Sequence, residues 1–231
     1  MIEQATLPPL VRGEWFPMTY DEFLAWAPKG LRTEWTDGKG IVYVSNSDRH
    51  QWMIALLYNL IDGFNDLFGL GRVVTAPYPA ILWPGGPHRE PDVMFVSKAR
   101  LDQWTDQRFH GAPDFAFEAL SEEMANEDRG RKRGDFEMAG AREYVMADAR
   151  PGRDEFIFLR LDAAGRYQDV EPDDQGRYHS EVLPGFWLDP KWFRQDPLPY
   201  YQDLLYAIAG RAYDEWLAAK RRAWLAGQSD S

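Results

Sequence analysis

Apolar residues recur along the chain with two different periods, and each period predicts one kind of element. Between Ser47 and Gly69 they fall at helical spacing, and these two residues supply a cap and a stop for a helix. Residues 91–97 and 113–121 are short runs, each opened by a proline and apolar on both faces. Such runs are typical of strands in a central sheet that helices cover.

Shorter patterns complete the predicted order of elements. Thr19 and Glu22 form a capping box, and Asp37-Gly38 supplies turn chemistry between two strands. This alternation of helices and strands predicts an α/β fold. The predicted elements are a short helix after Thr19, strands at 31–35 and 41–44, a strand-like stretch at 72–83 interrupted by prolines, a charged helix at 128–139, a strand at 143–147, antiparallel strands at 155–161, 167–170 and 178–183, and a last amphipathic helix or helix pair at 198–226.

The composition narrows the class of protein. The 231 residues are 45% hydrophobic and 15% aromatic, which is a globular composition and enough for one sizeable core. There is no cysteine, so disulfides, thiolate metal sites and cysteine nucleophiles are excluded. The longest apolar run, residues 52–61, is too short to span a membrane, and no signal peptide is visible. We therefore expect a cytoplasmic protein.

The formal charge of −11 argues against tight, non-specific binding to phosphate backbones. It does not exclude a nuclease, because carboxylates that hold a metal count as negative here but face a cation in use.

Two carboxylates interrupt the apolar strands. Glu118 lies inside Phe115–Leu120, and Asp92 opens the strand at 91–97. Burying a lone carboxylate costs several kcal/mol, about the scale of a desolvation penalty, so each needs a cation, a metal or a proton. Asp92 could instead cap a turn, and Glu118 could pair with an internal arginine. Together they favour a site for Mg²⁺ or Mn²⁺, since oxygen ligands without cysteine suit these ions.

Two further residues, Glu34 and Lys132, fit either an ordinary surface position or a place in the site. Glu34 lies where polar and apolar residues alternate, so spacing alone predicts a solvent-facing strand residue. Lys132 follows Asp128 by four residues, which fits either an exposed ion pair on a helix or a cation that reaches the carboxylate pair. Local spacing does not decide between these alternatives.

Other catalytic patterns are missing from the sequence. No pair among the four histidines has the helical spacing of a zinc protease, and His50 fits a cap or core-edge position better than a base. The serine-hydrolase and P-loop signatures are also absent. A glycosidase that uses two carboxylates ranks low, because its test is a carboxylate separation that sequence cannot supply.

The ordered set of motifs resembles the Uma2 family of restriction-endonuclease-like proteins, within the PD-(D/E)XK nuclease superfamily. The resemblance covers about residues 18–193. Any one motif is weak, but seven in the same order are specific. They are Glu34–Gly38, Asp48–Gln51, Glu90–Val96, Gly111–Asp114 leading to Glu118–Ser121, Asp128–Lys132, Gly140–Tyr144 and Leu183–Leu188.

The resemblance implies a restriction-endonuclease-like αβββαβ core with a central mixed sheet flanked by helices, an N-terminal hairpin, C-terminal antiparallel strands and a C-terminal helix. It divides the chain into a lead at 1–17, the domain at 18–195 and a helical extension at 196–231 that packs on the same domain.

The resemblance also assigns the site. Asp92 and Glu118 would be the acidic residues that bind Mg²⁺ or Mn²⁺, with Glu34 as an extra acidic ligand. The position two after Glu118 is Leu120 and not lysine, so the lysine of the motif would have moved to Lys132. These residues imply an endonuclease that hydrolyses DNA. The alternative is a catalytically silent binding or assembly module, with the apolar C-terminal helix as a partner surface or a homodimer interface.

Overall fold

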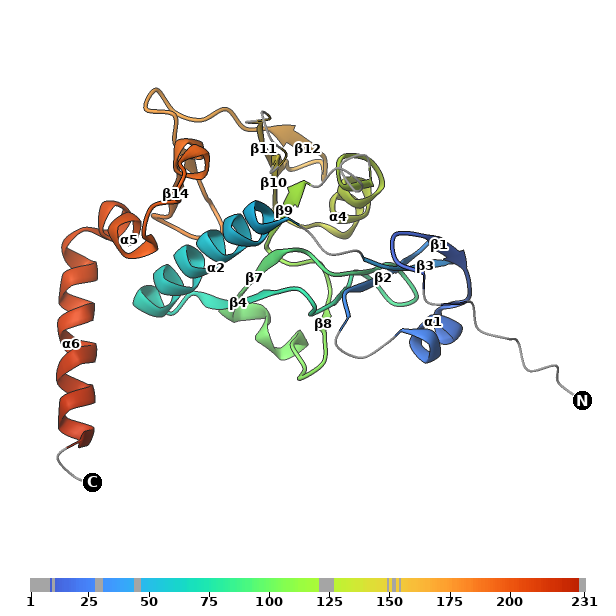
Figure 1. The fold of residues 1–231 in the computed structure, drawn as a ribbon, viewed down its shortest axis with the longest axis horizontal. Coiled ribbons are helices and arrows are strands. Elements are labelled where there is room, and N and C mark those ends of the chain that lie inside the picture. Colours follow the sequence, from blue (N-terminus) through green and yellow to red (C-terminus); the bar gives the residue numbers. More distant parts are fainter. Residues whose placement is uncertain are drawn as a thin grey trace, which may run out of the picture.

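The computed structural model describes residues 9, 11–27, 31–43, 47–120, 127–148, 150, 153 and 155–228. Val44 and Ser121, at the ends of two predicted strands, lie outside these residues. The centre of the fold is a mixed sheet in the order β12-β11-β10-β9-β7-β4 (Figure 1). Strands β9 and β10 run parallel, and the other neighbours are antiparallel. The strands are β4 (Gly71–Thr75), β7 (Val93–Ser97), β9 (Phe115–Leu120), β10 (Glu143–Asp148), β11 (Phe156–Leu161) and β12 (Tyr167–Asp169).

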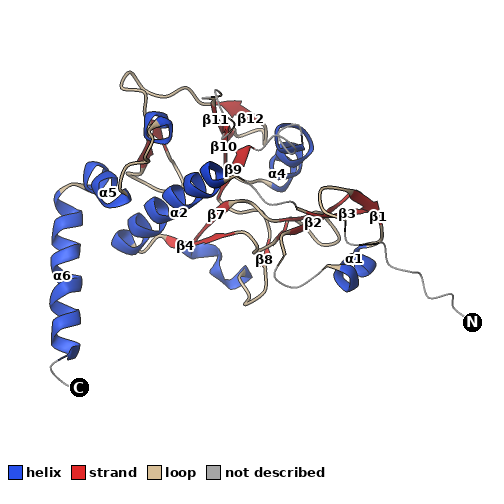
Figure 2. Ribbon diagram, viewed as in Figure 1, coloured by secondary structure: helices blue, strands red, loops and turns tan. Residues whose placement is uncertain are grey.

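Helices cover both faces of this sheet. Helix α2 (Asp48–Phe68) begins after Ser47, whose side chain accepts from the His50 amide, and ends at Gly69 with a φ of 64°. It packs on one face, while helix α4 (Arg133–Ala139), which directly follows the segment η2 (Asp128–Lys132), lies on the other (Figure 2). The order α2-β4-β7-β9-α4-β10 confirms the predicted αβββαβ core.

A second sheet lies beside the first, in the order β1-β3-β2-β6-β5-β8. The predicted hairpin is confirmed as β2 and β3, and its turn has positive φ at Asp37 (48°) and Gly38 (72°). Helix α1 (Tyr20–Trp26) begins with the predicted capping box at Thr19. The strands are β1 (Trp15–Pro17), β2 (Thr33–Thr36), β3 (Lys39–Val42), β5 (Ala80–Ile81), β6 (His88–Arg89) and β8 (Phe109–His110).

Two elements predicted before β10 differ from the structure. The strand-like stretch at 72–83 is split into β4 and β5, which belong to different sheets. Pro77 and Pro79 lie between them, and proline has no N–H with which to continue a ladder. The helix predicted at 128–139 opens as a wider π-helical turn, η2, before it becomes α4.

The C-terminal part carries the predicted strands at 155–161 and 167–170 as β11 and β12, and the predicted helix pair. The strand predicted at 178–183 is limited to residues 178–179, which pair with residues 187–188 in a separate small sheet. Helix α6 (Arg211–Gln228) follows α5 (Tyr201–Ala209) after a break at Gly210 and projects away from the sheets (Figure 1). Its residues 218–227 are all exposed, Trp224 among them. No helix within the described residues is both long and apolar enough to cross a membrane. The remaining elements are η1 (Lys98–Gln103), β13 (Tyr178–His179), β14 (Trp187–Leu188) and η3 (Pro190–Arg194).

Candidate active site

Asp92 and Glu118 lie opposite each other on one face of the central sheet. Strands β7 and β9 pair with Val93 opposite Phe117, so the next step of the same register sets Asp92 against Glu118. Because side chains alternate along a strand, Glu118 points to the face that α4 covers. Both residues are buried, with 2% and 1% of their surface exposed. The two carboxylates that sequence placed on separate strands therefore share one buried location.

Lys132 reaches this location from the π-helical turn η2. Its Nζ lies 2.7 Å from Glu118 Oε1 and 3.0 Å from Glu34 Oε1. The side chain is fully buried, which excludes the exposed ion pair that spacing allowed. π-Helical turns are often found at functional sites, where the extra residue redirects a side chain.

Glu34 is buried in β2, so the solvent-facing position that spacing favoured is wrong. Its second oxygen, Oε2, accepts a hydrogen bond from Arg89 Nη1 at 2.8 Å. Oε1 accepts from the Glu90 amide at 3.1 Å, in addition to facing Lys132. Glu34 thus joins the site through Lys132, and the structure brings all four predicted residues together.

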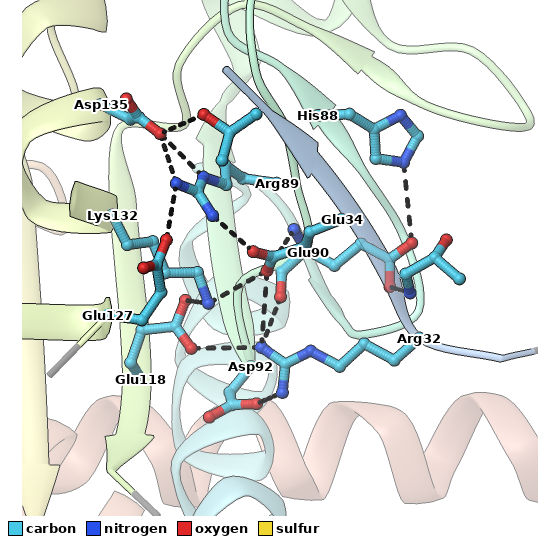
Figure 3. Close-up of polar contacts among 12 residues, drawn as sticks. Arg32, Glu34, His88, Arg89, Glu90, Asp92, Glu118, Glu127, Lys132 and Asp135 are labelled. Atoms are coloured by element: carbon cyan, nitrogen blue, oxygen red, sulfur yellow. Dashed lines mark hydrogen bonds and ion pairs between the residues drawn. The ribbon is translucent and has the colours of Figure 1, made fainter. Parts of the chain in front are cut away.

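Arg32 is the largest addition that the structure makes to the predicted site. Its Nη1 forms an ion pair with Asp92, and its Nη2 lies 3.2 Å from Glu118 Oε2 (Figure 3). Nη2 also donates to the Glu90 carbonyl at 2.7 Å. The guanidinium lies over the Tyr43 ring, 4.5 Å from its centroid. The alternative in which Glu118 pairs with an internal arginine is therefore realised here, together with the contact to Lys132.

A second arginine, Arg89, anchors the far side of Glu34. It is fully buried, and its Nε donates to Asp135 Oδ2 at 2.9 Å (Figure 3). Its Nη2 lies 3.3 Å from Glu127 Oε1. Arg32, Arg89 and Lys132 thus form a buried network of alternating charge with the carboxylates. Such pairing is what allows charged side chains to stay inside a fold.

Electrostatics keep the network ionised. Burial acts to raise the pKa of Glu34, but the charges of Lys132, Arg89 and Arg32 outweigh it and lower that pKa from 4.5 to about 2. Burial opposes ionisation of Asp92 as well, and Arg32, followed by His50, holds the pKa of Asp92 well below its usual range. Glu90 differs, because burial dominates there and raises its pKa.

We expect the fold to lose stability in acid through Glu34. A carboxylate with a lowered folded-state pKa stabilises the fold above its unfolded pKa, and this contribution disappears as the pH falls toward the folded value. The free energy of unfolding, measured by urea denaturation, should therefore fall between pH 4.5 and about 2. The decline should be shallower in Glu34→Gln. Equal slopes for the two proteins would contradict the role of Glu34.

The oxygen atoms around Arg32 also fit a hard divalent cation. One guanidinium contacts Asp92 Oδ1, Glu118 Oε2 and the Glu90 carbonyl, so three oxygens already face a single cation. Mg²⁺ is usually bound through one or two carboxylates and completes its shell with water and substrate phosphate. Within the described residues no three acidic or histidine side chains form a ready metal cage, and Arg32 contacts both Asp92 and Glu118.

The residues that sequence reasoning missed had weak signals. Arg32 precedes Glu34 by two, which puts both side chains on one face of an extended chain. Arg89 adjoins Glu90 in a charged run just before an apolar strand, and such a charged run is equally typical of a surface loop. His50, expected as a cap or core-edge residue, is buried in the first turn of α2 with Nε2 3.4 Å from Asp92 Oδ2.

Comparison with known proteins supports the fold and shows the family. The chain is similar to a crystal structure described as a "putative nuclease belonging to DUF820" from Anabaena variabilis ATCC 29413. The TM-score is 0.62 and the identity 17%, over 77% of this chain and 97% of the other. At that identity the likeness supports the fold alone. The curated proteins contain no match. The Uma2 family model, described as "Putative restriction endonuclease", matches residues 20–191, which include the site residues and every strand except β1. The chain therefore belongs to the Uma2 family.

Proposed function

We propose that this protein is a divalent-metal-dependent endonuclease that hydrolyses phosphodiester bonds in DNA. The observation that carries the proposal is the placement of Asp92 and Glu118 opposite each other on one sheet face, with one cation between them and Lys132 against Glu118. Membership of a restriction-endonuclease-like family supports a nuclease.

Each residue has a proposed part in the reaction. Asp92 and Glu118 would hold Mg²⁺ or Mn²⁺, and Glu34 would assist directly or through water. The metal would supply a Lewis acid for the scissile phosphate and a more acidic bound water. Lys132 takes the place of the lysine that Leu120 replaces in the usual motif. Its ammonium can orient the attacking water and offset the charge that develops on the phosphate.

A plasmid-nicking assay tests this function. With Mg²⁺ or Mn²⁺, we expect supercoiled DNA to be converted to open-circular and linear forms, and EDTA should stop the reaction because the proposed chemistry needs the metal. Nicking that continues unchanged in EDTA would contradict the proposal. Absence of nicking with either metal would also contradict it, provided that the protein is folded.

The arrangement of charges supports the alternative function, a catalytically silent binding or assembly module. All four carboxylate oxygens of Asp92 and Glu118 already face a protein donor, as expected of a module that binds no metal. Calorimetric titration with Mg²⁺ or Mn²⁺ at low salt separates the two, because only the nuclease should bind the ion. A cytoplasmic location and a homodimer through the C-terminal helices α5 and α6 stay predictions, and the mass of the particle in solution tests the second.

A further inference from the structure

The Arg32 guanidinium lies between Asp92 and Glu118 and contacts both carboxylates. It contacts Asp92 Oδ1, Glu118 Oε2 and the Glu90 carbonyl, three oxygens that come from the segment just before β7 and from β9. A Mg²⁺ ion binds such oxygens at about 2.0–2.1 Å, well inside hydrogen-bond distance. The same oxygens cannot serve a guanidinium and a metal together, because the two cations would overlap and repel.

Arg32 is held less firmly than the other arginine of the site. Arg89 is fully enclosed and uses its Nε and both terminal nitrogens, on Glu34, Asp135 and Glu127. Arg32 is held at its two terminal nitrogens, and its Nε has no hydrogen-bond partner among the described residues.

Among the three cations of the network, Arg32 is also the one that reaches solvent. Its side chain is 15% exposed, against 2% for Asp92 and for Glu118. Lys132 and Glu34 show no exposed side chain. A long, partly exposed side chain that is anchored at its guanidinium can turn toward solvent without opening the core.

We propose that Arg32 is a built-in competitor of the catalytic metal, which neutralises Asp92 and Glu118 when the ion is away and is displaced when the ion binds. The inference rests on the proposed function, since it assumes that this pair binds a divalent cation. Its consequence is a weakened apparent affinity for the metal. The site can bind a metal only in the fraction of molecules in which Arg32 has left the two carboxylates. The apparent Kd is the intrinsic Kd divided by this fraction, so the apparent affinity is lower.

The opposing interpretation is a permanent structural ion pair, like that of Arg89. The test must also separate the loss of a positive charge from the loss of a competitor for the carboxylates. Removing any cation near the site increases the attraction of the site for a metal ion. Arg32→Lys keeps the charge but loses the fork that spans two carboxylates. Arg131→Met removes the same charge from a neighbouring arginine that is 38% exposed and pairs with Asp37 and Glu127.

Calorimetric titration with Mn²⁺ tests the inference on wild type, Arg32→Met, Arg32→Lys and Arg131→Met. We expect the Kd for Mn²⁺ to fall by about tenfold or more in Arg32→Met. It should fall by a smaller factor in Arg32→Lys and stay near the wild-type value in Arg131→Met. A Kd in both Arg32 variants equal to that of wild type would overturn the competition and leave the metal site standing.

A measurement on the wild-type protein covers the case in which Arg32→Met does not fold. The Nε–H signal of Arg32 in a ¹⁵N spectrum can be assigned by its loss in Arg32→Lys. We expect this signal to shift as Mg²⁺ is added, in step with saturation of the site. A signal that stays fixed while the metal binds would overturn the inference. Failure of every protein to bind Mn²⁺ or Mg²⁺ would overturn it together with the metal dependence of the proposed function.

Discussion

Glu118→Gln is expected to lower the rate of metal-dependent plasmid nicking by about a thousandfold or more, which corresponds to about 4 kcal/mol of lost transition-state stabilisation. The amide keeps the shape of the side chain but removes the negative charge that faces Arg32 and Lys132. It also removes half of the acidic pair that would hold the metal. Asp92→Asn should have a similar effect, because the two residues would share one ion.

A buried carboxylate outside the site supplies the matched control. Asp114 comes just before β9, as Asp92 comes just before β7. Asp114 accepts a hydrogen bond from the Ser97 amide at 2.7 Å, and Asp92 accepts one from the Ala119 amide at 2.8 Å. Asp114→Asn should therefore nick at close to the wild-type rate. A rate for folded Glu118→Gln that equals the rate for Asp114→Asn would remove Glu118 from the reaction.

Arg89→Met is expected to destabilise the fold by about 3–5 kcal/mol, the usual cost of removing one partner of a buried ion pair. The substitution leaves Glu34, Asp135 and Glu127 without their shared cation in the interior. Since a domain of this kind is stable by only about 5–15 kcal/mol, the change should be visible as a large shift of the urea midpoint in circular dichroism.

An arginine with one carboxylate partner and a more exposed side chain gives the comparison for this stability measurement. Arg100 lies 3.3 Å from Asp114, with 28% of its side chain exposed. Pairs of this kind contribute about 0–1 kcal/mol, so Arg100→Met should shift the midpoint little. If Arg89→Met were no less stable than Arg100→Met, the network around Arg89 would not support the fold.

Sequence reasoning could find Glu118 because its signal is local. A charged residue inside an apolar run is out of place whatever the tertiary structure, and this holds for Asp92 at the head of its strand. The resemblance then added Glu34 and Lys132, for which spacing favoured or allowed a solvent-exposed position. The helix around residues 48–68 and the hairpin turn at Asp37 were likewise predictable from periodicity and caps.

Arg32 and Arg89 could not be found in this way, because their partners are distant in sequence. Arg32 lies 60 residues from Asp92 and 86 from Glu118, and Arg89 lies 46 residues from Asp135. Periodicity predicts on which face of a strand or helix a side chain lies. It does not predict which side chain from another sheet contacts it. For the same reason the solvent-facing prediction for Glu34 was wrong, since β2 is covered on both sides by parts of the chain that join it only after folding.

The most direct test of the metal site is a crystal structure of the wild-type protein soaked in Mn²⁺, with data collected for anomalous scattering. We predict one anomalous peak between Asp92 and Glu118, coordinated by an oxygen of each, with the Arg32 guanidinium moved away from both. An intact site with no peak, and with Arg32 still paired to both carboxylates at saturating Mn²⁺, would contradict the account.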